Sequence, residues 1–395
     1  MVISKVRLWG RFCRASLRYK QIADLSPIYL THIRTRMSIP SIVLGISVPL
    51  TVGSPNDSDV RSVGEDVWNA ATVAWELLGL QGELLVEDNR AQSIRIDETI
   101  RQLHKAGAIA IVGLPTSDEV ISASSALSDT GLVALSPMAT SPKLDRFPQI
   151  FRARPSDAHS AKLLVKYMSS QGITKIGVLS EDTAYSWDCA TSVMEHAARR
   201  GIEALSCKIT THSHLADPTE TRQALDAFSQ SKLDALFINT QDEEGFFRFV
   251  QLSREALGSI QIFGSAMPGS RKFRSMAGKA ATGIIYVEPV ASGLERTPEA
   301  ARLLGRFRER FGEPKTGEYA VLYTFASLCA VAQATRQEGP LSQTLSTMTF
   351  DDPVNGAFRF EDREIKYLES WAGAENRIRI VQIGVDATLD LGFGD

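Results

Sequence analysis

The chain has 395 residues, of which 44% are hydrophobic and 23% charged, and its formal net charge is −3 at pH 7. This length predicts two domains or one two-lobed body, and this composition is ordinary for a soluble globular protein. The small net charge argues against bulk nucleic-acid binding. No apolar run reaches the roughly 18 residues that cross a bilayer, so we expect no transmembrane segment.

Residues 1–37 form a basic tail. Eight Lys or Arg stand there against one acid, Asp24, so the tail carries +7 and leaves about −10 for the remainder. A secretory signal needs an unbroken apolar segment after a basic start, but Lys or Arg recurs every few residues up to Lys20. Three interpretations stay open: a true start near Met37, a basic targeting or membrane-surface segment, and a disordered extension.

From residue 41 onward, predicted strands alternate with predicted helices. The strands are expected at 42–48, 83–87, 108–112 and 132–135, and the helices at 64–78, 94–106 and 117–128. Such alternation implies right-handed βαβ units and a parallel sheet that is covered on both faces.

The pattern then restarts with a short extended segment at 150–152. Ser156 and Asp157 are expected to cap a helix that runs to about residue 170, with a side-chain oxygen accepting from free N–H groups. Further strands are expected at 175–179, 203–209, 234–239, 260–263 and 283–287, with helices ending near 200 and at 219–229 and 243–256. The sequence therefore predicts two successive α/β sheets of similar size.

The C-terminal part predicts two helices, at 298–310 and 318–336, and then two strands, at 356–360 and 377–383. These elements are too few for a third domain, so we expect them to complete the first lobe and then the second. The resulting prediction is an α/β protein with two Rossmann-like lobes and a hinge of several crossovers. The first lobe would hold 38–154 and 288–345, and the second 155–287 and 346–395.

Two loops of small hydroxyl residues follow strands of the first lobe, at 113–117 and 136–140. Ligands bind at the carboxyl ends of strands in open α/β sheets, and helix N-termini favour anions. Ser117 and Thr140, with the backbone N–H groups around them, therefore predict a cradle for a small carboxylate. The alternative is that these residues are ordinary helix caps.

The second lobe offers further loops at the same edge. Tyr185 follows the strand at 175–179, where its ring can cover an apolar part of a ligand and its hydroxyl can bond, or where it can cover the lobe's own core. Asn239 and Ala266 follow two more strands and either line a cleft or belong to plain turns.

The sequence contains no GxGxxG, GxxxxGK[ST] or GxSxG motif and no set of base and nucleophile, so we expect no enzymatic activity. The four cysteines are widely spaced, at Cys13, Cys189, Cys207 and Cys329. Cys189 and Cys207 could pair, although buried free thiols are the favoured interpretation. His212 and His214 lie in a polar loop without partners at ligand spacing, and we predict no metal and no cofactor.

The motifs resemble those of type I periplasmic solute-binding proteins of the leucine/isoleucine/valine class, which feed ABC importers. The resemblance covers about residues 41–365. It depends mainly on two blocks in this order, Ser136-Pro137-Met138-Ala139-Thr140-Ser141-Pro142 and Phe151-Arg152-Ala153-Arg154-Pro155-Ser156-Asp157.

The resemblance implies two lobes that close on an amino acid, an amide or a short peptide, an ABC permease as partner, and a periplasmic or other extracytoplasmic location. Ser117 and Thr140 would bind the α-carboxylate or ammonium of the ligand, and Asp157 would lie near the ammonium. Tyr185 would close the site from the second lobe. The other ligand-binding positions would be Thr116, the backbone at Met138 and Ala139, Asn239 and Ala266.

One departure from the family pattern concerns the ligand's ammonium. Many amino-acid binders of this family place an acid after a late strand of the second lobe, where this chain has Ser265-Ala266-Met267-Pro268. A desolvated ammonium without a carboxylate is costly. Asp157 or Asp242 would therefore substitute, or the ligand is not a standard amino acid, which opens amides, short peptides and aromatic acids.

Two functions remain open. The first is a solute-binding protein for an ABC importer, and the second is a ligand-sensing regulator on the same fold, such as a cytoplasmic amide sensor, which the lack of a clear signal peptide favours. A sugar-type repressor would need a helix-turn-helix that residues 1–37 do not provide, whereas a degenerate lobe pair that serves only as an interaction module is not excluded.

Overall fold

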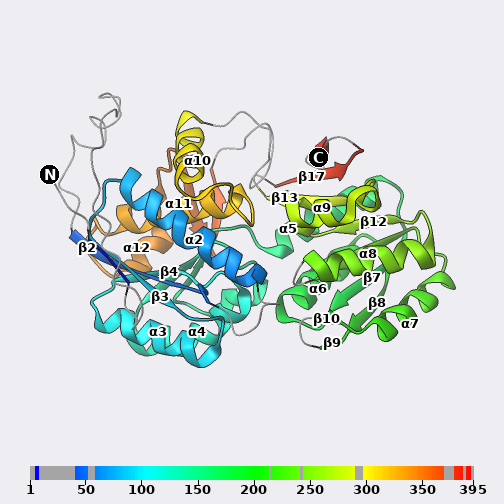
Figure 1. Cartoon of the computed structure of the whole chain (residues 1–395), viewed down its shortest axis with the longest axis horizontal. Helices are drawn as coiled ribbons and strands as arrows, with labels where there is room; N and C mark the ends of the chain where they lie inside the picture. Colours follow the sequence, from blue (N-terminus) through cyan, green and yellow to red (C-terminus); the bar gives the residue numbers. More distant parts are fainter. Residues whose placement is uncertain are drawn as a thin grey trace.

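The computed structural model describes residues 5–8, 41–51, 58–212, 215–240, 243–289, 297–368, 378–385 and 388–392. Two α/β lobes lie side by side, each with a sheet that carries helices on both faces (Figure 1). The chain passes to the second lobe after residue 152, returns after residue 289 and passes again after residue 367. The predicted architecture of two Rossmann-like lobes with several crossovers is therefore confirmed.

The sheet of the first lobe has the strand order β1-β3-β2-β4-β5-β6-β16-β15-β14 within the described residues. Strands β1 to β6 pair in parallel, while β14, β15 and β16 pair antiparallel at one edge. The bounds are β1 (Lys5–Leu8), β2 (Ser41–Val48), β3 (Gln81–Asp88), β4 (Ala110–Gly113), β5 (Val133–Ser136), β6 (Ile150–Arg152), β14 (Thr349–Phe350), β15 (Phe358–Glu361) and β16 (Glu364–Tyr367).

Helices cover both faces of this sheet because its central strands are apolar on both sides. One face packs against α2, α10, α11 and α12, and the other against α3 and α4. Helix α11 is buried on nearly all sides. The bounds are α2 (Ser58–Leu77), α3 (Ser93–Lys105), α4 (Ser117–Thr130), η2 (Pro142–Arg146), α10 (Pro298–Phe311), α11 (Glu318–Ala334) and α12 (Leu341–Thr347).

The sheet of the second lobe has the order β18-β17-β13-β12-β11-β7-β8 within the described residues. Helices α5 and α6 pack on one face, and α7, α8 and α9 on the other. The strands are β7 (Lys175–Glu181), β8 (Glu203–Ile209), β11 (Ala235–Asn239), β12 (Gln261–Gly264), β13 (Ile285–Pro289), β17 (Ile378–Ile383) and β18 (Thr388–Gly392), beside a small pair, β9 (Thr211–His212) and β10 (Leu215–Ala216). The helices are α5 (Asp157–Ser170), α6 (Ala184–Arg199), α7 (Pro218–Ser229), α8 (Glu243–Leu257), η3 (Met267–Gly269), α9 (Arg271–Ala277) and η4 (Gly278–Ala281).

The structure corrects the predicted lobe boundary at the C-terminal end. Strands β14 to β16 extend the first sheet beyond β6, so the second-lobe segment expected at 346–395 is wrong up to Tyr367. Phe358 and Phe360 on β15 lie in the first-lobe core, where Phe360 meets Phe151 edge to face at 5.2 Å. Burial of these rings keeps the segment in the first lobe, and only β17 and β18 complete the second.

The basic tail also differs from its prediction at four residues. Residues 5–8 form β1, which pairs in parallel with β3 at the edge of the first sheet. A disordered extension is therefore wrong for these four residues, and the other residues of the tail lie outside the described part. None of the helices in the described ranges is long and apolar enough to cross a membrane.

The described cysteines are free thiols, so the alternative of a Cys189–Cys207 disulfide is contradicted. Cys189 and Cys329 are buried, as favoured for free thiols, whereas Cys207 is partly exposed and Cys13 lies outside the described residues. Among the residues that the structure describes, no group of three or more His, Cys, Asp or Glu could hold a metal ion. His214 is outside that set.

Candidate ligand-binding cleft

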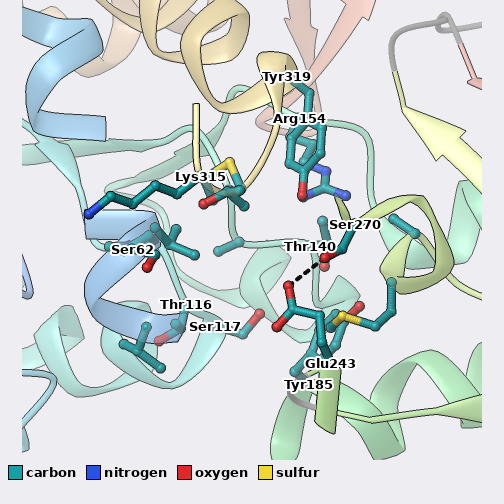
Figure 2. Close-up of a pocket in the computed structure, with 18 of the residues that line it drawn as sticks. Ser62, Thr116, Ser117, Thr140, Arg154, Tyr185, Glu243, Ser270, Lys315 and Tyr319 are labelled. Carbon is teal, nitrogen blue, oxygen red and sulfur yellow. Dashed lines mark hydrogen bonds between the residues drawn. The ribbon is translucent and has the colours of Figure 1, made fainter. Parts of the chain in front are cut away.

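A cavity of about 360 Å³ lies between the lobes, within the size range of small-molecule sites. The first lobe lines it with the start of α2, the loops after β4, β5 and β6, and the segment that leads into α11. The second lobe adds the starts of α6, α8 and α9 and the loop after β12. Figure 2 shows these side chains converging on one space from both lobes. The carboxyl ends of the strands thus face the cleft, as the sequence predicted.

Gly113 and Thr116 shape the loop after β4. Gly113 has φ 136°, and a Cβ at this position would lie 2.3 Å from the carbonyl oxygen of Ser47, so only glycine fits. Thr116 then caps α4. Its Oγ1 accepts from the N–H of Glu119 at 3.2 Å, and the Glu119 carboxylate accepts from the N–H of Thr116 at 2.9 Å. For Thr116 the alternative of an ordinary helix cap is therefore correct, although the residue also borders the cavity.

Ser117 presents a hydroxyl to the cavity. Its Oγ accepts from the N–H of Ser141 at 3.2 Å, and its side chain is buried at the wall of the cleft. Among the described residues its own hydroxyl proton has no acceptor, so it can donate to a ligand. Met138 and Ala139 border the same space. This wall therefore suits a carboxylate.

Thr140 presents the opposite polarity. Its hydroxyl donates to Oδ2 of Asp157 at 2.7 Å, which leaves the Thr140 oxygen as an acceptor towards the cavity. Asp157 itself is buried behind Thr140 and does not line the cavity. Burial raises the pKa of Asp157 from its ordinary value of 3.8 to about 6, although the Thr140 bond lowers it. At neutral pH the ionised Asp157 thus keeps Thr140 oriented to accept from an N–H group.

Two details of Asp157 differ from the sequence prediction. Neither Ser156 nor Asp157 caps α5 through its side chain, because the Asp157 carboxylate faces Thr140 across the start of the second lobe. Any effect of Asp157 on a ligand ammonium is therefore transmitted through Thr140 and the local field, without direct contact from the cavity wall.

Tyr185 lines the cavity from the second lobe, and two polar residues hold it. Its hydroxyl lies 3.4 Å from Oγ of Ser265, which donates to Oδ1 of Asn239 at 2.5 Å. Nδ2 of Asn239 donates to the carbonyl of Ser186 at 3.2 Å. Asn239 is fully buried and does not line the cavity, so it positions the first turn of α6. Burial also raises the pKa of Tyr185, which stays neutral.

Glu243 provides the acid that is missing at Ala266. Ala266 does line the cavity, but the carboxylate comes from the first residue of α8, and its Oε1 accepts from Oγ of Ser270 at 2.8 Å (dashed in Figure 2). The sequence predicted the neighbouring residue, Asp242, as a substitute acid, and Asp242 lies outside the described residues. Glu243 could have been predicted to line the cleft, since it is the first residue of a predicted helix that directly follows a loop expected there.

The cavity is also lined by three residues that were not predicted from the sequence, Arg154, Lys315 and Tyr319. Arg154 stacks on the ring of Tyr319, with its guanidinium carbon 4.9 Å from the ring centroid. Lys315 forms an ion pair with Glu65 of α2 at the edge of the cavity. Arg154 and Tyr319 are far apart in the chain, and only the return of α11 to the first lobe brings them together.

Comparison with known proteins identifies the family. The family model described as periplasmic binding protein matches residues 42–383. The chain belongs to this family. The resemblance to leucine/isoleucine/valine-binding proteins that the motifs indicated is confirmed by the similar proteins. The Leu/Ile/Val-binding protein homolog 3 of Brucella melitensis is 21% identical over 361 residues, which cover 83% of this chain and 94% of that protein.

Solved structures share the fold of this periplasmic binding protein. The leucine-binding protein LivK of Thermotoga maritima matches with a TM-score of 0.72 and 14% identity over 88% of this chain and 97% of its own. LivJ of Streptococcus pneumoniae, in complex with isoleucine, has a TM-score of 0.71 and 18% identity, and the match covers 89% of this chain and 100% of that protein. A solute-binding protein of Rhodopseudomonas palustris, in complex with 3,4-dihydroxybenzoic acid, has a TM-score of 0.71 and 16% identity, and the match covers 89% of this chain and 96% of that protein.

Several polar contacts connect the lobes of this periplasmic binding protein beside the cleft. Oγ of Ser141 donates to Oδ2 of Asp188 on α6 at 2.6 Å, and Lys143 forms an ion pair with the same carboxylate. At the crossover, Nη2 of Arg152 donates to Glu364 at 2.7 Å, and Glu364 accepts from the N–H of Ser156 at 2.8 Å. A hinge motion must therefore pivot about these contacts or break them.

Proposed function

We propose that this protein is an extracytoplasmic solute-binding protein that captures a small amino-acid-like ligand between its lobes and delivers it to an ABC importer. The observation that carries the proposal is the division of polar groups across one cavity. The first lobe supplies the Ser117 hydroxyl as a donor, and the second supplies the Glu243 carboxylate.

Each group has a matching part of an amino acid. The ligand carboxylate lies against Ser117 and the backbone of the loop after β5, near the N-terminus of α4, where free N–H groups favour an anion. The ligand ammonium lies between Glu243 and the acceptor oxygen of Thr140. Tyr185 covers the remaining, less polar part. The similar solved structures include a leucine-binding protein, a complex with isoleucine and a complex with 3,4-dihydroxybenzoic acid, and these ligands are compatible with this class.

Capture then follows from closure of the hinge. A ligand that contacts both lobes stabilises the closed arrangement by the difference between its affinities for the closed and open states. Because the ligand carboxylate bonds the first lobe and the ammonium reaches Glu243 of the second, a ligand that lacks the ammonium contacts the second lobe less well. Such a ligand would shift the closure equilibrium less.

Isothermal titration calorimetry tests the proposal. The purified chain is titrated with a panel of amino acids, amides, short peptides and aromatic acids, and we expect saturable binding of one ligand per chain. Ser117→Ala should weaken that binding about tenfold, the typical effect of one hydrogen bond to a charged group. The matched control is Ser124→Ala on α4, whose hydroxyl bonds only the carbonyl of Ile121, outside the cavity.

The absence of binding across the whole panel would contradict the proposal. Equal affinities for wild type and Ser117→Ala would instead remove Ser117 from the site. The importer part has its own test, because fractionation of the native host should find the protein outside the cytoplasm. A wholly cytosolic pool would leave ligand capture intact but contradict delivery to an importer.

A further inference from the structure

Arg154 contributes a cation to the lining of the cavity. It follows β6 in the crossover to the second lobe, and its guanidinium stacks on Tyr319 of α11. Among the described residues, this guanidinium makes no ion pair and no hydrogen bond. Asp157 feels its charge, but that carboxylate already accepts from Thr140 and lies behind the cavity wall.

The other two cations at the cavity have partners. Lys315 pairs with Glu65, and Lys272 lies 3.8 Å from Glu244 on α8. Arg154 thus differs from them in offering its donors to the cavity. A guanidinium presents several N–H groups in a planar fork that matches a carboxylate, and stacking on an aromatic ring leaves those edges accessible.

Arg154 is also separate from the position already assigned to the ligand's first carboxylate. Figure 2 shows Arg154 and Tyr319 at one end of the drawn cavity, whereas Thr116 and Ser117 lie at the other. The cavity therefore holds two places for an anion, at Ser117 and at Arg154, and one place for a cation at Glu243.

We propose, on the basis of the function given above, that Arg154 determines specificity by binding a second carboxylate, and that the preferred ligand is an acidic amino acid. The α-carboxylate and ammonium occupy the places near Ser117 and Glu243, and the side-chain carboxylate extends to Arg154. A neutral aliphatic ligand would leave the guanidinium partly desolvated and without a counter-charge, which costs binding energy.

Calorimetric titrations with pairs of ligands of which one member lacks the second carboxylate test this proposal. The pairs are L-glutamate with L-glutamine, L-aspartate with L-asparagine, and terephthalate with benzoate. We expect the diacid of an amino-acid pair to bind roughly ten- to hundredfold more tightly than its neutral partner, as charge-assisted hydrogen bonds typically give. The aromatic pair shows whether a second carboxylate is enough without an ammonium.

Two variants assign the preference to Arg154. Arg154→Gln should reduce the affinity for the diacid to that for the amide and leave the amide's affinity within twofold, while Arg154→Lys should fall between the two. The matched control is Arg101→Gln, which removes a cation from the surface of α3 in the same lobe, away from the cavity. It should leave the preference unchanged.

The outcomes separate this inference from the function on which it rests. If L-leucine or an amide binds as tightly as every diacid, or if Arg154→Gln weakens diacid and amide equally, the inference is wrong while solute capture stands. If no ligand of the panel binds at all, the proposed function and the inference fail together. The comparison on the wild-type protein decides the preference even if Arg154→Gln does not fold.

Discussion

Replacement of Asp157 by asparagine should make the unfolding free energy of the protein less sensitive to pH. Burial raises the pKa of this carboxyl from 3.8 to about 6 in the folded chain, so the native state binds its proton more tightly than the unfolded state does. The resulting stabilisation is fully present below pH 3.8 and is lost as the pH rises through about 6. Above that pH, the native state holds a buried carboxylate at a free-energy cost.

The cost follows from the pKa difference. A shift of about two units corresponds to about 3 kcal/mol of unfolding free energy at pH 8 and to about half of that at pH 5. Asparagine is neutral at both values, and its amide oxygen can still accept from the Thr140 hydroxyl. Asp157→Asn should therefore raise the unfolding free energy, relative to wild type, by about 1 to 2 kcal/mol more at pH 8 than at pH 5.

Urea unfolding of wild type and Asp157→Asn at both pH values measures this difference. The subtraction removes contributions from other buried acids, such as Glu119 and Glu87, whose pKa values are raised to about 7. Asp226→Asn changes an exposed carboxylate on α7 and is the control. The reasoning would be refuted by a difference between wild type and Asp157→Asn that is the same at both pH values or larger at pH 5.

Two further predictions concern the second lobe. Glu243→Gln should lower the affinity for ligands that carry an ammonium by roughly ten- to hundredfold, as measured by calorimetry. The affinity for aromatic acids without an ammonium should stay within about twofold of the wild-type value. Equal losses of affinity for both classes would contradict the assigned role. Asn239→Ala should lower the unfolding free energy by about 1 to 3 kcal/mol, because it leaves Ser265 and the carbonyl of Ser186 without their buried partner; an unchanged urea midpoint would contradict this network.

The fold could be predicted from sequence wherever the signal is local. Apolar strands alternating with amphipathic helices gave both lobes, and the strand-to-loop transitions placed Ser117, Thr140 and Tyr185 at one edge. All three line the cavity. Each of these positions depends on the end of one strand and the few residues after it, so neighbouring sequence carries the information.

The parts that could not be predicted depend on contacts between distant segments. Strands β14 to β16 are short, and only the burial of Phe358 and Phe360 beside Phe151 decides which sheet they join. Arg154 and Tyr319 meet through the same kind of long-range packing. At Asp157 a hydrogen bond to a distant residue replaces the predicted local one, because its carboxylate accepts from Thr140 and does not cap α5.

The central claim is that one small ligand lies between the lobes with its carboxylate at Ser117 and its ammonium at Glu243. A crystal structure of the complex with the tightest ligand of the calorimetric panel tests it most directly. The account predicts a ligand carboxylate oxygen within hydrogen-bond distance, about 3 Å, of Oγ of Ser117, and a ligand nitrogen equally close to the Glu243 carboxylate. A ligand bound outside this cleft, or one bound in it with neither contact, would contradict the account.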